Sequence, residues 1–146
     1  NEDYEMITGK RSHCSNSGTE RIYQFKNDDN QTLNIAFRAY NDGVVFRYQL
    51  DETEASADTT YVTQELTTYP IPDGMTRWMQ QYAIDYEGFF PLATDGASVE
   101  KRNPQFWGYP ALVEPQDSLF VLITEANIRP GNSGSRLYNG NHSDRY

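Results

Sequence analysis

The stretch "RAYNDGVVFRY", residues 38–48, constrains the fold of this chain more than any other part of the sequence. Before the turn, "TLNIAFRA" (32–39) alternates apolar with other residues at a period of two, and "VVFRYQL" (44–50) does the same after it. The pair Asp42-Gly43 lies between the two runs, and glycine supplies the positive φ that a tight turn requires. Two alternating runs around such a turn predict an antiparallel β-hairpin.

The rest of the chain is predicted to form further short strands separated by turns. The expected strands lie in "ERIYQFKN" (20–27), "YVTQELTTY" (61–69), a strand pair or bulged strand within 76–91, "FWGYPALVEP" (106–115) and "SLFVLITEAN" (118–127). No segment shows a helical period over ten or more residues, and the tail (128–146) carries no predicted closing element. The sequence therefore predicts an all-β fold, an antiparallel β-sandwich forming a single domain over 1–146.

Charge and hydropathy exclude several classes of partner. The 146 residues include 12 basic and 21 acidic side chains, which gives a net charge of −9. Nucleic-acid binding requires clustered basic residues that neutralise phosphates, and an anionic membrane surface attracts them for the same reason. No run approaches the roughly 20 apolar residues of a membrane span. We expect no nucleic acid and no membrane among the partners.

The residues of common catalytic sites do not assemble into a recognisable motif. The chain lacks a Gly-x-Ser-x-Gly elbow, and His13 and His142 lie in polar terminal stretches, which disfavours a nucleophilic triad. Cys14 is the single cysteine, so an internal disulfide is excluded. Asp85 and Glu87, two apart in "AIDYEGFF", would project from one face of a strand toward one cation. The alternative is a pair of solvated acids.

Aromatic residues make up 14% of the chain. They favour strands and core packing, and a flat ring also suits the apolar face of a sugar. Trp78 and Trp107 each lie among other aromatics, and core packing is the default interpretation for both. Arg38 and Arg47 lie on the polar faces of the predicted hairpin, where either is expected to bind a carboxylate from the neighbouring sheet rather than a substrate.

"FRAYNDGVVFRYQL" (37–50) resembles a hairpin signature of the N-terminal domain of glycoside hydrolase family 97, Phe-Arg-x-Tyr-(Asn/Asp)-Asp-Gly-x-x-(Phe/Tyr)-Arg-(Tyr/Phe). Further matches follow the family order: "GKRS" before the first strand, then Trp78 and the pair Tyr86-Glu87, and finally "YPALVE…LFVLITEANI". The resemblance covers residues 5 to 130.

This resemblance implies a fold and a parent activity. Family members are retaining or inverting α-glycosidases, such as α-glucosidases and α-galactosidases, mostly from Bacteroides-like bacteria and exported to the periplasm or secreted. They join an N-terminal β-super-sandwich, similar to galactose mutarotase, to a (β/α)8 barrel that carries the catalytic carboxylates. The chain would then be a truncated piece of the super-sandwich, inactive by itself, whose partners are the barrel of the same polypeptide and an oligosaccharide substrate.

The resemblance also implies site residues. In the family, barrel glutamates hold a calcium ion near the substrate, and one glutamate reaches in from the N-terminal domain. Glu87 is the best match for that glutamate, and Trp78, Tyr86 and Trp107 are the expected substrate-binding aromatics. The alternatives are an autonomous carbohydrate-binding module, with an exposed tryptophan as its platform, or a purely structural β-sandwich.

Overall fold

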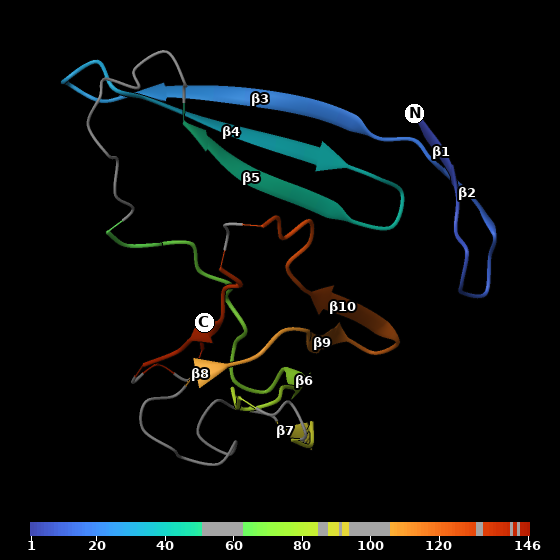
Figure 1. The fold of residues 1–146 in the computed structure, drawn as a ribbon. Helices are drawn as coiled ribbons and strands as arrows, with labels where there is room; N and C mark the ends of the chain where they lie inside the picture. Colours follow the sequence, from blue (N-terminus) through green and yellow to red (C-terminus); the bar gives the residue numbers. More distant parts are fainter. Residues whose placement is uncertain are drawn as a thin grey trace. The chain divides into compact units, whose positions relative to one another are not determined.

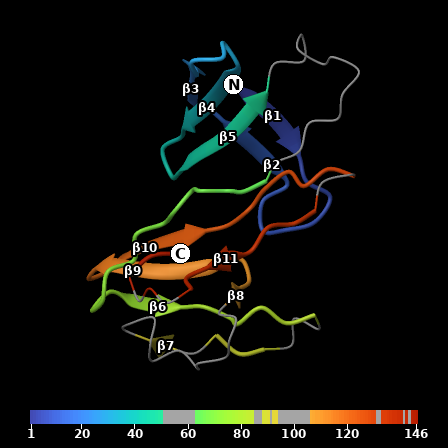
Figure 2. The same cartoon turned by 90° about the vertical axis from the view of Figure 1, so that its left-hand side faces the viewer.

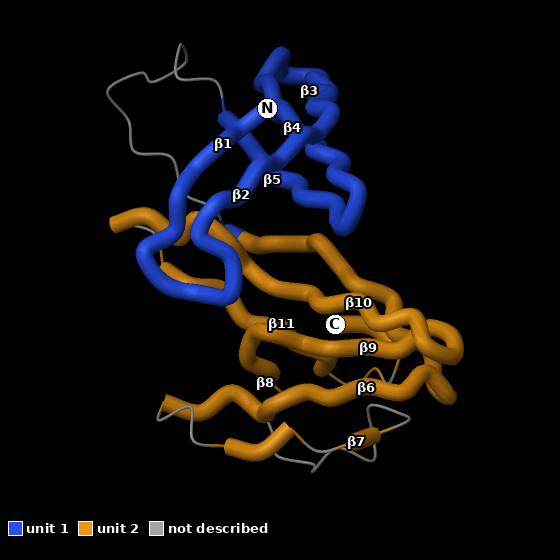
Figure 3. Tube along the Cα trace, turned by 90° about the vertical axis from the view of Figure 1, so that its right-hand side faces the viewer, with its two compact units in different colours: residues 1–63 blue, residues 64–146 orange. Residues whose placement is uncertain are grey.

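The computed structural model describes residues 1–50, 63–84, 88–90, 92–93, 106–130, 133–140, 142 and 144–146. The chain divides into two compact units, Asn1–Thr63 and Gln64–Tyr146 (Figure 3), and each is described by itself. The expectation of a single domain over 1–146 stays a prediction.

Unit 1 consists of antiparallel strands (Figure 1). Its strands are β1 (Glu2–Glu5), β2 (His13–Asn16), β3 (Thr19–Lys26), β4 (Thr32–Ala39) and β5 (Val44–Leu50). β1 pairs with β2, and β3, β4 and β5 form one sheet in that order. Sequence analysis did not predict β1 and β2, whose residues are mostly polar and exposed.

The predicted hairpin is confirmed, with β4 and β5 bounded by the residues where the alternation begins and ends. The positive φ expected of Gly43 is wrong, because Gly43 is not among the glycines with positive φ. The backbone N–H of Tyr40 donates to the carbonyl of Gly43 at 2.8 Å and closes the turn. Phe37 pairs with Phe46 in the register, so the aromatic side chains of both strands share one face, as the period of two requires.

Unit 2 contains two further antiparallel sheets (Figure 2). Its strands are β6 (Thr76–Trp78), β7 (Leu92–Ala93), β8 (Phe106–Trp107), β9 (Ala111–Gln116), β10 (Leu119–Ile123) and β11 (Leu137–Tyr138). One sheet has the order β10-β9-β6-β7, and β11 pairs with β8. The predicted strand at 118–127 is confirmed as β10. The single strand predicted at 106–115 is instead two strands in different sheets, β8 and β9, because the chain leaves the strand conformation at 108–110, where the Tyr109–Pro110 bond is cis.

The hydrophobic core described by the structure lies in unit 2. Its buried members are Ile71, Met79, Ala93, Trp107, Ala111, Val113, Leu137 and Tyr146. Trp107 is 0% exposed, its ring meets that of Tyr146 edge-on at 6.3 Å, and its indole Nε1–H donates to Asn139 Oδ1 at 2.9 Å. One side chain thus joins β8 to the segment that follows β11, with its polar atom satisfied as burial demands.

Two predictions are wrong, the strand at 61–69 and the absence of a closing element in the tail (128–146). Residues 63–69, the described part of the predicted strand "YVTQELTTY", form no strand. Instead Tyr69 exchanges backbone hydrogen bonds with Tyr146 (2.8 and 3.2 Å), and Ile71 N–H donates to the Asp144 carbonyl at 2.8 Å. The tail therefore does close on the core, through β11 and Tyr146. The local sequence pattern did not predict this closure, because long-range backbone pairs leave no signal in it.

The fold class is confirmed. All strand pairs among the described residues are antiparallel and none of these residues is helical, which is consistent with a β-sandwich. It follows that the described residues include no helix with the length and apolar character needed to cross a membrane. Among the described residues of this segment, 76–84 and 88–90, β6 is the one regular strand. Asp85, Tyr86 and Glu87 lie outside the described residues.

Trp107→Phe is expected to lower the free energy of unfolding by about 2–4 kcal/mol, because it leaves a gap in the core and removes the donor to a buried carbonyl oxygen. Trp78→Phe, at a partly exposed position, should cost less than about 1 kcal/mol. Urea unfolding of both variants measures the difference. An equal loss of unfolding free energy in the two variants would contradict the central position of Trp107 in the core.

Tyr109 introduces a pH dependence at high pH. Burial is the main cause that raises the pKa of its phenol to about 12, and neighbouring Tyr69 adds to the shift. The unfolded phenol ionises near its ordinary value of 10.0, while the folded phenol keeps its proton up to about 12. The contribution of the protonated Tyr109 phenol to the free energy of unfolding is fully present below pH 10 and is lost as pH rises toward 12. Urea unfolding through this range should show a smaller fall in stability for Tyr109→Phe than for wild type; an identical fall would contradict the assignment.

Candidate functional site

Trp107 is placed inside the core. Its ring is fully buried among unit 2 residues and its nitrogen is bonded to Asn139. Trp107 therefore packs in the core, which was the default interpretation of this residue. Its substrate-binding role stays a prediction, and the structure adds no exposed ring face in favour of that role.

Trp78 lies on the opposite side of the four-stranded sheet from the core. It is partly exposed, pairs with Leu92 on β7 and Leu112 on β9, and its ring centroid lies 6.1 Å from that of Phe120. Its neighbours are apolar, so the surroundings resemble a packing surface as much as a sugar platform. The substrate-binding role of Trp78 stays a prediction.

The remaining expected site residues cannot be placed. Tyr86 and Glu87, together with Asp85, lie outside the described residues. The part of the chain that is described contains no group of three or more His, Cys, Asp or Glu side chains arranged to hold a metal. A hollow of about 460 Å³ beside β9 is lined by Asp73, Glu114 and Asp117, yet these acids form no such group.

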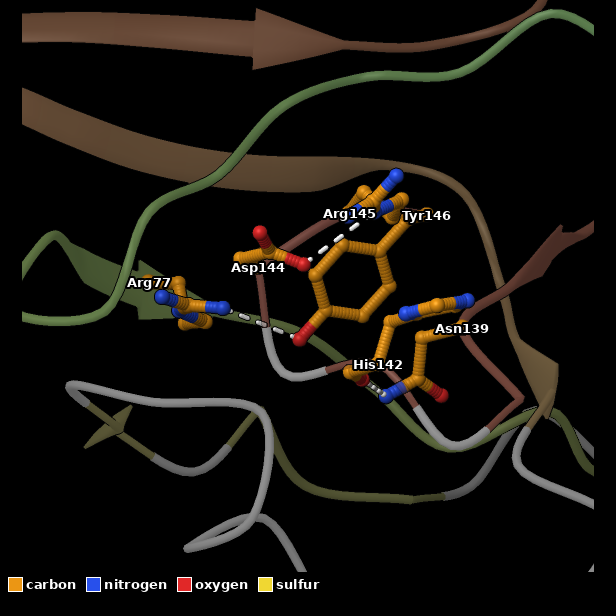
Figure 4. Close-up of polar contacts among 6 residues, drawn as sticks. All are labelled: Arg77, Asn139, His142, Asp144, Arg145 and Tyr146. Carbon is orange, nitrogen blue, oxygen red and sulfur yellow. Dashed lines mark hydrogen bonds and ion pairs between the residues drawn. The ribbon is translucent and has the colours of Figure 1, made fainter.

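A polar cluster around Arg77 was missed by sequence reasoning (Figure 4). Arg77, on β6, is 0% exposed. Its Nη1 donates to Tyr146 Oη at 3.0 Å, its Nη2 to the Pro72 carbonyl at 2.7 Å and its Nε to the Met75 carbonyl at 3.3 Å. The guanidinium carbon also lies 5.8 Å from the centre of the Tyr146 ring.

Arg77 holds structure together and shows no feature of a reactive group. Its donors bind protein oxygens of the 72–75 turn and of Tyr146, which offsets the cost of burying the charge. The only local signal was an arginine directly before a tryptophan in the short strand "TRW". Its partner Tyr146 is 69 residues away, so no sequence window could pair them.

Arg38 binds a carboxylate, as predicted, but that carboxylate belongs to a neighbouring strand of its own sheet and not to a neighbouring sheet. Its Nε donates to Glu20 on the neighbouring strand β3, directly opposite in the register. This hydrogen bond is the main cause that raises the pKa of Arg38, with a smaller contribution from Tyr40. Both partners are substantially exposed, so the pair contributes little to stability.

The three-stranded sheet of unit 1 carries an open apolar hollow of about 510 Å³. Its apolar lining comes from Tyr23, Phe25, Phe37 and Val44. The rings of Tyr23 and Phe37 meet edge-on at 5.9 Å. Among the described residues, Arg21 and Arg38 are the charged side chains of the lining.

The comparisons with known proteins agree with the resemblance. The family model described as "Glycosyl-hydrolase 97 N-terminal" matches residues 1–145. A curated protein of Streptomyces bingchenggensis (strain BCW-1), described as "Probable retaining alpha-galactosidase", is 30% identical over 139 residues, which cover 93% of this chain and 20% of that protein. The chain thus spans about a fifth of the length of this relative. No solved structure matches the chain.

The hairpin signature, the all-β architecture and the match over residues 1–145 together show that the chain belongs to the N-terminal domain family of glycoside hydrolase 97.

Proposed function

We propose that this chain is a non-catalytic domain of a family 97 α-glycosidase, which packs on the catalytic (β/α)8 barrel and walls one side of its active site. The parent would hydrolyse α-glycosidic bonds of oligosaccharides. Two findings support this proposal: the match to the family's N-terminal domain and the similarity to part of a protein described as a retaining α-galactosidase. In this proposal the catalytic carboxylates belong to the barrel, and the chain alone is inactive.

The observation that carries the packing role is the exposed apolar face of the unit 1 sheet. Phe25 is 52% exposed and Val44 is 70% exposed, on the face that an amphipathic sheet normally buries. Apolar patches of this kind mark interaction surfaces in soluble proteins. A domain that covers another part of its own polypeptide would need such a surface.

Calcium in the parent enzyme is part of the same proposal. Calcium prefers several oxygen ligands, with carboxylates foremost, and would neutralise charge and hold groups in position. This chain would contribute Glu87 to an ion held mainly by barrel glutamates, and Trp78 or Tyr86 would supply an aromatic contact to the substrate. Export of the parent to the periplasm or the medium of a bacterium is proposed on the resemblance alone.

The full-length parent is expected to hydrolyse p-nitrophenyl α-galactoside or α-glucoside, while this chain hydrolyses neither. Parallel assays of the parent, of the parent lacking residues 1–146 and of this chain alone make the test. Activity of the chain alone would contradict the non-catalytic role, and a parent inactive on every α-glycoside would contradict the proposed reaction.

Calorimetric titration of the chain with maltooligosaccharides separates this proposal from an autonomous binding module. If the chain forms only one side of a sugar pocket that the barrel completes, the chain alone should give no binding heat. An autonomous module would bind the sugar without the parent.

Glu87→Gln in the parent is expected to weaken calcium binding by at least about tenfold, because a carboxylate ligand is replaced by a neutral amide. Glu5→Gln, at an exposed position of β1, is the matched control, since it makes the same change of a carboxylate to an amide and keeps both Asp85 and Glu87. Calcium titration of both variants gives the comparison. Unchanged affinity in Glu87→Gln would remove Glu87 from the site.

A further inference from the structure

Asn139-Gly140 is the one asparagine-glycine pair in the sequence, and it follows β11 directly. In such a pair the backbone nitrogen of the glycine attacks the side-chain carbonyl carbon of the asparagine, because no Cβ on the glycine hinders the approach. The new C–N bond closes a succinimide ring, and ammonia leaves with the side-chain nitrogen and the glycine amide proton. Water then opens the ring to aspartate, or to isoaspartate, in which the main chain runs through the former side chain.

The fold holds the Asn139 side chain away from this reaction. Asn139 is 2% exposed, and both polar atoms of its carboxamide are bonded to other residues. Oδ1 accepts the indole N–H of Trp107 at 2.9 Å, and Nδ2 donates to the His142 carbonyl at 2.8 Å (Figure 4). These bonds restrict the side-chain rotation that brings the carbonyl carbon to the Gly140 nitrogen. Burial also excludes the water that the second step consumes.

The products of the reaction do not fit the site that the asparagine occupies. The Asn139 Nδ2 faces a carbonyl oxygen, so an aspartate oxygen at that position would place two acceptors together in a buried site. Isoaspartate adds a carbon to the main chain and moves the carboxylate to a different place. Either product loses the donor to His142, and with it the bridge from Trp107 to the tail.

We propose that Asn139 is a site of spontaneous deamidation, closed in the folded domain and open to reaction when the tail leaves the core. The modification acts in one direction, because the altered residue no longer bridges Trp107 and His142 and the tail does not close again in the same way. Each opening of the tail thus carries a chance of a lasting chemical mark. This inference concerns the chemistry of the chain itself and does not depend on the proposed activity.

The rate of deamidation in the native protein tests the proposal. Trypsin cleaves after Arg136 and Arg145, so one peptide (137–145) carries the site, and its mass reports the conversion of amide to acid. In mildly alkaline buffer the folded protein should deamidate at Asn139 at least about tenfold more slowly than the same peptide free in solution, since only the open fraction reacts. Equal rates would overturn the proposal. Isoaspartate beside aspartate in the peptide is expected from the succinimide route, and aspartate alone would contradict it.

Trp107→Phe removes the donor to Asn139 Oδ1 and should raise the rate at Asn139 several-fold. Trp78→Phe, at a partly exposed position of β6, is the matched control and should leave the rate unchanged. An unchanged rate in Trp107→Phe would overturn the proposed protection. If that variant does not fold, the wild-type protein still decides: its rate should rise with urea in parallel with the loss of folded protein, and a rate independent of urea would contradict the proposal.

Asn139→Asp reproduces one product of the reaction and tests its consequence. It is expected to lower the Tm of the protein by several degrees, because a carboxylate replaces the buried donor to His142. Asn127→Asp makes the same change at an exposed position of unit 2 and should shift Tm by less than about 1 °C. An equal Tm shift in the two variants would contradict the claim that the modified tail no longer closes on the core.

Discussion

The buried indole of Trp107 is the contact on which unit 2 depends. It packs edge-on against Tyr146 and donates to Asn139, so it joins β8 to two points of the segment after β11. Tyr146 in turn accepts a hydrogen bond from Arg77 and pairs with Tyr69 through the backbone. Because these contacts link residues from 69 to 146, the last residues of the chain are structural parts of the core.

The distribution of apolar surface explains the functional proposal. The described core cluster belongs to unit 2, whereas in the three-stranded sheet of unit 1 Ala36 is the buried side chain. Both this sheet and the four-stranded sheet of unit 2 expose apolar faces. Small domains reach stability by burying such faces, so a chain with this much apolar surface in water is better suited to a larger assembly than to an isolated existence.

Strand prediction succeeded where the pattern was local and failed where partners were distant. The hairpin of β4 and β5 was predicted to its terminal residues because the alternation acts over neighbouring positions, although Gly43 does not have the positive φ expected of it. The Thr-rich segment 61–69 had the same alternation, yet over its described part the backbone of Tyr69 pairs with Tyr146 instead. β-Propensity is outweighed by such tertiary pairing.

The candidate site was predictable mainly through resemblance. Trp78 and Trp107 look alike in sequence, each among aromatics, and the structure separates them only because strand register places Trp107 inward and Trp78 outward. The role of Arg77 had no specific local signal in the sequence, since its acceptors include a phenol 69 residues away. Glu87 and Tyr86 depend on the family motif and lie outside the described residues.

The central claim is that this chain is one domain of a much larger glycosidase. The mass of the native gene product, together with the sequence that continues after Tyr146, tests it most directly. The account predicts a product several times heavier than 16.8 kDa, with an alternating strand and helix pattern after the β-domain. A native product of 16.8 kDa would contradict it and would mean that the exposed apolar faces serve a different partner.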